Sequence, residues 1–130
     1  MNSHTETRAQ AAKVPAAKPS TREELWRRLH RGRNVIEGSL SEAIDLHQVA
    51  REAALSPYHF HRSFTRLFGE TPHAYLARRR MERAADLLRS SDMPVTDVCC
   101  ACGYESLGSF STLFRKHAGV SPLQFRKSRK

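Results

Sequence analysis

Small and hydrophobic residues recur at helical spacing from about residue 21 onward. Leu25, Leu29, Gly32 and Ile36 follow one another at intervals of four, three and four residues, which places them on one face of a helix. Similar spacing returns in later segments, whereas no segment alternates polar and apolar residues over the length of a strand. The pattern therefore predicts an all-α chain.

Residues typical of helix starts and stops divide the chain into about seven predicted helices. Ser, Thr, Asp and Pro favour the first positions of a helix, and Gly favours its end. The predicted helices span residues 21–38, 46–53, 57–68, 72–90, 94–102 and 106–117, with a partial helix from 121. Thr21 and Glu24 have the spacing of a capping box at the first start, and Thr96 is expected to cap the helix over 94–102.

A motif in the third predicted helix returns 50 residues later. The first copy is Phe60-x-x-x-Phe64 with Gly69-x-Thr71-Pro72-x-x-Tyr75, and the second is Phe110-x-x-x-Phe114 with Gly119-x-Ser121-Pro122-x-x-Phe125. The residues expected to face inward are Phe60, Phe64 and Leu67 in the first copy and Phe110, Leu113 and Phe114 in the second. The chain thus builds one unit twice.

Each copy has the organisation of a helix-turn-helix: a short helix, a tight turn and a second helix. Ala50 and Cys99 are the small residues that allow each pair of helices to cross closely, and Ala54 and Gly103 hold the turns. If this turn position needs a positive φ, alanine costs about 1 kcal/mol there. In such motifs the second helix enters the major groove of DNA.

The charge of the chain favours a polyanionic partner. Its 130 residues include 22 Lys and Arg against 13 Asp and Glu, a formal net charge of +9. Basic runs at residues 78–80 and 126–130 directly follow the two copies of the motif. Duplex DNA, a regular polymer that can be contacted at two places, fits both the charge and the repeat.

Composition narrows the remaining classes. No run of 18 apolar residues predicts a membrane span, and residues 1–20 are polar, without the apolar core of a secretory signal. We expect these 20 residues to form a flexible tail. Three clustered cysteines make a poor disulfide framework and favour a reducing, cytoplasmic setting.

The two copies resemble the DNA-binding region of the AraC/XylS family. Residues 49–64, together with 69–76, are similar to its first helix-turn-helix, and residues 98–104 with the second copy are similar to its C-terminal signature. The resemblance covers about residues 22–127. It implies two three-helix subdomains, at 21–71 and 92–130, joined by a linker helix over 72–91.

The resemblance implies a sequence-specific transcription regulator that binds double-stranded DNA through two successive major grooves. A helix over about 72–88 is about 25 Å long, which allows the two second helices to lie about 34 Å apart, one turn of B-DNA. A basic RNA-binding or protein-interaction module is the alternative. The RNA-binding aromatic motifs and the GXXG loop are missing from the sequence.

Candidate DNA-reading residues lie opposite the apolar side of each second helix. In the first they are Tyr58, His61, Arg62, Thr65 and Arg66, and in the second Ser109, Ser111, Thr112, Arg115 and Lys116. The family match places base contacts at Tyr58, His61 and Arg62, and arginine can pair with guanine through two hydrogen bonds. Family members commonly carry an arginine at the position of Thr112, and Gly108 offers no side chain. We therefore expect the first copy to supply most of the base specificity and the second mainly backbone contacts.

Other chemistry is less well supported by the sequence. Cys99 and Cys102 have C-x-x-C spacing, but a structural zinc site needs four ligands and no second pair accompanies them. His59 and His61 are two residues apart and do not share a helix face. No catalytic constellation is evident, so we expect no enzyme, no metal site and no cofactor.

The resemblance also implies partners. Activation through RNA polymerase is expected, while repression by occlusion stays open. Stand-alone family members suggest a monomer, but a fragment of a longer regulator is equally compatible, and no pocket for a small-molecule effector is evident in the sequence.

Overall fold

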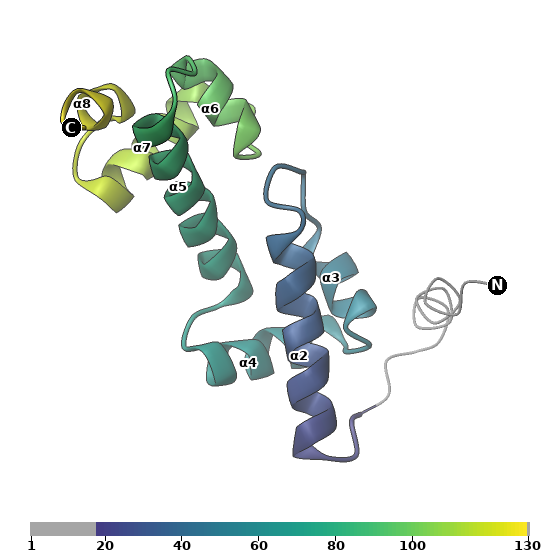
Figure 1. Cartoon of the computed structure of the whole chain (residues 1–130). Coiled ribbons are helices and arrows are strands. Elements are labelled where there is room, and N and C mark those ends of the chain that lie inside the picture. The colour runs from purple at the N-terminus through teal and green to yellow at the C-terminus, as the bar shows by residue number, and fades with distance from the viewer. Residues whose placement is uncertain (1–17, 130) are drawn as a thin grey trace. The chain divides into compact units, whose positions relative to one another are not determined.

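A computed structural model describes residues 18–129, in which all regular secondary structure is helical. The seven helices of this range, α2 to α8, are labelled in Figure 1. The chain divides into two compact units: the first comprises residues up to 39 and 44–75, and the second residues 40–43 and 76 onward. The predicted all-α class is confirmed. The predicted tail falls mainly on residues 1–17, which lie outside the described residues.

The first unit contains α2 (Arg22–Glu37), α3 (Leu46–Glu52), α4 (Pro57–Phe68) and the beginning of α5 (Pro72–Ser90). The hydroxyl of Thr21 caps α2 by accepting from the backbone N–H of Glu24 at 2.9 Å. The carboxylate of Glu24 turns back one residue further than a capping box requires and accepts from the backbone N–H of Ser20. Hydrogen bonds from Ser20, and then from Arg28, lower the pKa of Glu24.

Two phenylalanines of α4 form the centre of the first core. Phe60 and Phe64 are 2% and 0% exposed. Gly32 of α2 allows the close approach, because a Cβ at this position would lie 2.4 Å from a ring carbon of Phe60. The ring of Phe64 also meets Tyr75 edge-on, and the hydroxyl of Tyr75 donates to Glu37.

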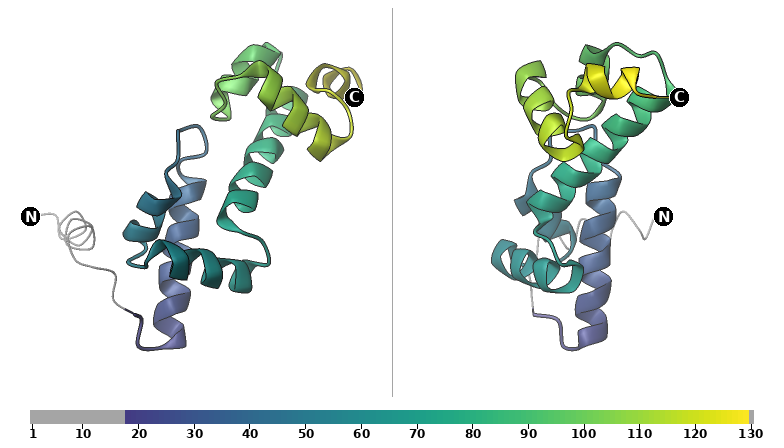
Figure 2. Two further views of the ribbon diagram at one scale, coloured as in Figure 1. Left: turned by 180° about the vertical axis from the view of Figure 1, so that it is seen from behind. Right: turned by 90° about the vertical axis from the view of Figure 1, so that its left-hand side faces the viewer.

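The second unit contains the remainder of α5 with α6 (Val95–Ala101), α7 (Leu107–Ala118) and α8 (Pro122–Lys127), seen from two further sides in Figure 2. Its buried core consists of Met81, Ala84, Ala85, Leu88, Val98, Cys99, Cys102, Phe110 and Phe114. Phe110 and Phe114 occupy the places that Phe60 and Phe64 occupy in the first unit. Both copies of the sequence repeat therefore supply the central aromatic pair of a core.

Capping residues set the ends of both second helices, as predicted. Ser56 accepts from the N–H of His59, and Ser106 from the N–H of Ser109, both at 3.2 Å. Gly69 and Gly119 end α4 and α7 in left-handed conformations, with φ of 79° and 85°. Only glycine adopts this conformation without steric cost.

Three details of the predicted pattern are wrong. Leu67 and Leu113 are 42% and 38% exposed instead of facing inward. Leu67 lies in the last turn of α4, where Phe68 packs against Phe64 in its place, and Leu113 lies to one side of the narrow Phe110–Phe114 face. Thr96 does not cap α6, because the helix begins at Val95 and Thr96 is already inside its first turn.

Candidate nucleic-acid interface

The first helix of each pair ends in the same hydrogen-bonded turn. Leu55 N–H donates to the carbonyl of Ala50 at 2.9 Å, and Tyr104 N–H donates to that of Cys99 at 3.1 Å. Ala54 and Gly103 precede these donors and have φ of 60° and 84°. This is the Schellman arrangement, in which the residue after the C-cap adopts a left-handed conformation. Both copies thus aim their second helix with one turn geometry.

α4 presents a basic and aromatic outer surface. Tyr58 is 72% exposed, and His61, Arg62 and Arg66 are exposed as well. Thr65 is only half-buried, and its hydroxyl donates to the carbonyl of His61 at 2.7 Å. Four of the five residues expected to read DNA here are therefore exposed on the outer side of α4. Thr65 is the exception, because its hydroxyl hydrogen is already bonded within the helix.

Arg62 is oriented by its neighbour one turn earlier. Its Nη1 donates to the hydroxyl oxygen of Tyr58 at 3.3 Å. Both residues line a hollow of about 560 Å³ beside α4, together with Arg66 and Lys18. No residue that lines this hollow is acidic, so its electrostatic character favours an anion such as a DNA phosphate.

α7 presents a smaller and less featured surface. Ser109, Thr112, Arg115 and Lys116 are exposed, and Ser111 is half-buried. The hydroxyl of Thr112 donates to the carbonyl of Gly108 at 3.0 Å, the same bond that Thr65 makes in α4. The cationic side chains of this helix lie in its last turns, away from the N-terminal part that faces bases in a docked helix-turn-helix.

The basic runs that follow the two motifs are largely used within the second unit. Arg79 forms an ion pair with Glu82 at 2.6 Å, and Arg80 donates to the backbone carbonyls of Leu40 and Glu42. Arg129 donates to carbonyls at the end of α5. The sequence analysis took these runs as support for a polyanionic partner. It missed that their arginines donate hydrogen bonds to backbone carbonyls of loops and helix ends.

Arg129 also binds a carboxylate next to the end of α5. Its Nη2 lies 2.5 Å from Oδ1 of Asp92. The hydrogen bond and the charge of Arg129 lower the pKa of Asp92. The C-terminal run of basic residues thus holds the chain end against α5.

Two of the three clustered cysteines are core residues. Cys99 and Cys102 are buried, Cys100 is exposed and all three are free thiols. Burial raises the pKa of Cys99 and raises that of Cys102 to about 11. Within residues 18–129, no group of three or more His, Cys, Asp and Glu side chains is placed to hold a metal ion.

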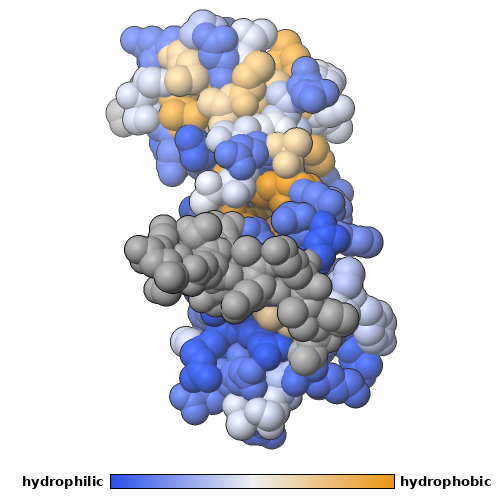
Figure 3. All heavy atoms as spheres, turned by 90° about the vertical axis from the view of Figure 1, so that its right-hand side faces the viewer, coloured by the Kyte–Doolittle hydropathy of each residue, from blue (hydrophilic) through white to orange (hydrophobic). Residues whose placement is uncertain are grey.

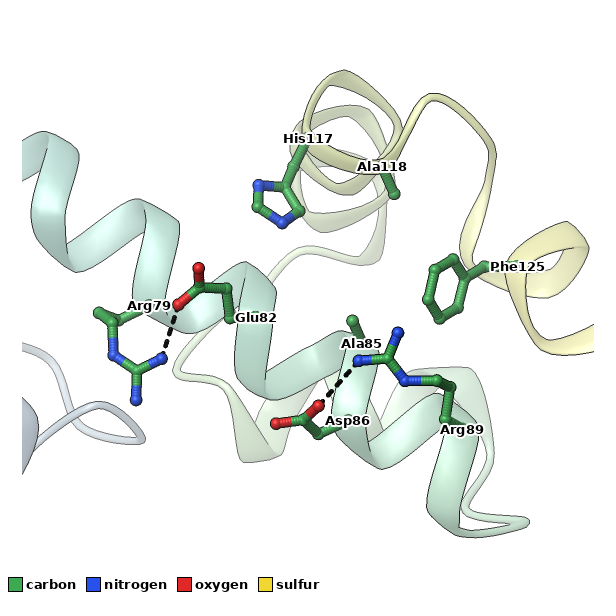
Figure 4. Close-up of a pocket in the computed structure, with 8 residues that line it drawn as sticks. All are labelled: Arg79, Glu82, Ala85, Asp86, Arg89, His117, Ala118 and Phe125. Atoms are coloured by element: carbon green, nitrogen blue, oxygen red, sulfur yellow. Dashed lines mark hydrogen bonds and ion pairs between the residues drawn. The ribbon is translucent and has the colours of Figure 1, made fainter. Parts of the chain in front are cut away.

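A second hollow, of about 420 Å³, lies in the second unit between α5, α7 and α8 (Figure 4). Its charged side chains are paired with one another: Arg79 with Glu82, and Arg89 with Asp86 at 2.9 Å. The guanidinium of Arg89 also lies over the ring of Phe125. Both ion pairs join residues of α5, so they form one wall of the hollow.

Figure 3 shows mainly blue, hydrophilic residues in the lower part of the visible face, whereas orange, hydrophobic residues lie among blue ones in the upper part. None of the helices in the described range is long and apolar enough to cross a bilayer.

Comparison with known proteins supports the resemblance seen in the sequence. The curated relatives include the HTH-type transcriptional activator RhaS of Escherichia fergusonii, 39% identical over 94 residues, and that of Klebsiella pneumoniae, 38% identical over 94 residues. Each match covers 72% of this chain and 34% of the relative. The chain thus matches about a third of the length of these relatives.

Solved structures share the fold over most of the chain. The C-terminal domain of AraT, a response regulator from Geobacillus stearothermophilus, has a TM-score of 0.76 and 34% identity, covering 78% of this chain and 85% of that one. The DNA-binding domain of the global transcriptional factor AdpA, solved in complex with a target DNA, has a TM-score of 0.72 and 32% identity, covering 77% of this chain and 90% of that one. The family described as a helix-turn-helix domain matches residues 49–128. The chain belongs to the AraC/XylS family of helix-turn-helix transcription regulators.

Proposed function

We propose that this protein regulates transcription by binding double-stranded DNA in a sequence-specific manner, with α4 as its main reader of bases. The observation that carries the proposal is the outer surface of α4. An exposed Tyr58 and an exposed Arg62 lie one turn apart, in contact with each other, beside a hollow without acidic residues. An arginine held in this way is suited to the two acceptors of guanine in the major groove.

The second helix-turn-helix is proposed to contribute mainly phosphate contacts. Ser109, Ser111 and Thr112 are short side chains, and Arg115 and Lys116 supply its charge. We propose that residues 21–71 and 92–130 act as two reading subdomains joined by 72–91, and that α4 and α7 occupy successive major grooves of the bound duplex. A hydroxyl-radical footprint with two protected segments about one helical turn apart would support this arrangement.

The similarity of AdpA, which was solved with a target DNA, supports binding to duplex DNA. The similarity of the RhaS activators supports a role in activation, and we propose contact with RNA polymerase on this ground. We further propose that the protein is a monomer without catalytic activity. We propose that it acts in the cytoplasm, because bacterial chromosomal DNA lies there.

Selection of bound duplexes from a random pool, followed by affinity measurement over a range of salt concentrations, tests the proposal. Six to eight phosphate contacts predict a log–log slope of about −6. We expect an enriched motif and a slope of this size. Equal affinity for duplex DNA, duplex RNA and single strands would instead favour a basic module without specific readout, and a slope near zero would contradict DNA binding by this surface.

A further inference from the structure

Three histidines from three helices line one cavity of the first unit. His47 comes from α3, His61 from α4 and His73 from α5, and the cavity has a volume of about 390 Å³. All three side chains are exposed. Only His61 belongs to the expected reading surface, and nothing in the sequence spacing, with intervals of 14 and 12 residues, connects the other two to it.

The surroundings of the histidines leave them available to a ligand. The other lining residues are apolar except Asp45, and Oδ1 of Asp45 already accepts from the backbone N–H of His47 at 2.9 Å. Asp45 is the one carboxylate among the lining residues, and α2 contributes no lining residue. The histidines are not placed to share a metal ion, so an ion bound by all three is not the reason for their grouping.

The start of α5 favours an anion in this cavity. His73 is the second residue of this 19-residue helix, where the helix dipole carries partial positive charge. Protonated imidazoles of His47 and His73 would add full positive charges to the same cavity.

We infer that this cavity binds a backbone phosphate of duplex DNA, held by the imidazolium groups of His47 and His73 beside the reading residue His61. The inference rests on the proposed function, since the cavity adjoins the N-terminal half of α4. Histidine changes its charge between about pH 5 and pH 8. A bound phosphate stabilises the charged form of an adjacent imidazole, so DNA binding takes up protons and tightens as the pH falls.

The test compares DNA binding at about pH 6 and about pH 8 for the full chain and for the double variant His47→Gln, His73→Gln. The probe is a fluorescent duplex of random sequence and about 24 base pairs, which offers phosphates without requiring a known operator. We expect wild type to bind about tenfold more tightly at the lower pH. Its log–log salt slope should become steeper by about 1 to 2, since each added phosphate contact contributes about 0.9. The double variant should lose most of both changes.

Two further variants separate charge from structure. His73→Lys carries a positive charge at both pH values. The contribution of residue 73 to the pH dependence should therefore disappear, while tight DNA binding is kept. His117→Gln removes an exposed histidine of the second unit and should keep the pH dependence of wild type. A double variant that is folded by circular dichroism and retains the full pH effect would overturn the inference.

The same experiment distinguishes failure of the inference from failure of the proposed function. Absence of binding to duplex DNA by wild type at both pH values would contradict the proposed function itself. Binding with an unaltered pH effect in the double variant would contradict only the histidine site. Imidazole NMR signals of His47 and His73 that shift with millimolar inorganic phosphate as strongly as with duplex would assign the cavity to a free ion and overturn its assignment to DNA.

Discussion

Arg28 of α2 donates from Nη1 to the backbone carbonyl of Ala54, at 2.9 Å. Ala54 is the one residue other than glycine with a positive φ in the described range. The Arg28 side chain is 17% exposed, and its guanidinium also pairs with Glu24 at 2.5 Å. The strained turn of the first helix-turn-helix is therefore held from outside by α2.

Replacing Ala54 by Gly should stabilise the protein. Its φ of 60° costs an L-residue roughly 1–2 kcal/mol, and glycine avoids this strain. Part of the gain is lost, because glycine gives up more conformational entropy when the chain folds. We expect the free energy of unfolding in urea to rise by about 0.5–1 kcal/mol. Ala53→Gly is the matched control. Ala53 has a φ of −81°, which suits alanine, so this change should destabilise the protein. A loss of stability in Ala54→Gly would show that the turn is not strained.

Replacing Gly103 by Ala should destabilise the second unit strongly. A Cβ at Gly103 would lie 2.7 Å from the carbonyl oxygen of Leu40 and 2.8 Å from Nη2 of Arg80, in addition to the cost of its φ of 84°. We expect a loss of about 2–4 kcal/mol in the free energy of unfolding. Gly69→Ala has a similar φ of 79° but nothing within 4 Å of the added atom, so it should cost only about 1 kcal/mol. Equal losses would contradict the close approach at Gly103.

Arg62→Ala and Arg115→Ala should affect DNA binding in different ways. Arg62 is expected to read a base, so its removal should weaken binding to a selected operator by about 1–3 kcal/mol and relax preference at one position. Arg115 is expected to contact phosphate, so its removal should weaken binding to all duplexes alike and reduce the salt slope by about 1. Affinities across operator variants measure both effects. Loss of sequence preference only in Arg115→Ala would reverse the assigned roles.

Thiol labelling of the native protein at about pH 8 should modify Cys100 first, because the thiolate is the reactive form. Burial raises the pKa of Cys102 to about 11 and also raises that of Cys99, and both thiols are shielded from solvent, so both should react slowly at this pH. We expect one fast-reacting thiol, which disappears in Cys100→Ser, and two that react only on unfolding. Fast labelling of Cys102 in the native state would contradict its burial.

Local features of this chain were predictable because they depend on neighbours along the sequence. Ser56 and Ser106 cap their helices through donors three residues away. Gly69 and Gly119 end those helices through a backbone conformation. The recurring Phe pairs marked the buried faces for the same reason, since a helix has a fixed period.

The repeat also located its own irregularity. Ala54 and Gly103 are 49 residues apart, whereas the capping residues Ser56 and Ser106 are 50 apart. The extra residue of the second copy thus lies between Gly103 and Ser106. The hydrogen-bonded turn is preserved, and the insertion falls in the link that follows it.

By itself, then, the sequence determined the helices and the two helix-turn-helix copies, which follow from short-range spacing. Its resemblance to a known family indicated the family. Tertiary structure alone decided which polar groups meet across long separations. Arg80 reaches the carbonyls of residues 38 and 40 positions away, and Arg28 reaches one 26 positions away. His47 and His73 line one cavity only because the first residues of α5 belong to the same unit as α3. Such contacts depend on how the helices pack together. The periodicity of a helix shows which of its faces is buried, but not which residues of other segments that helix will contact.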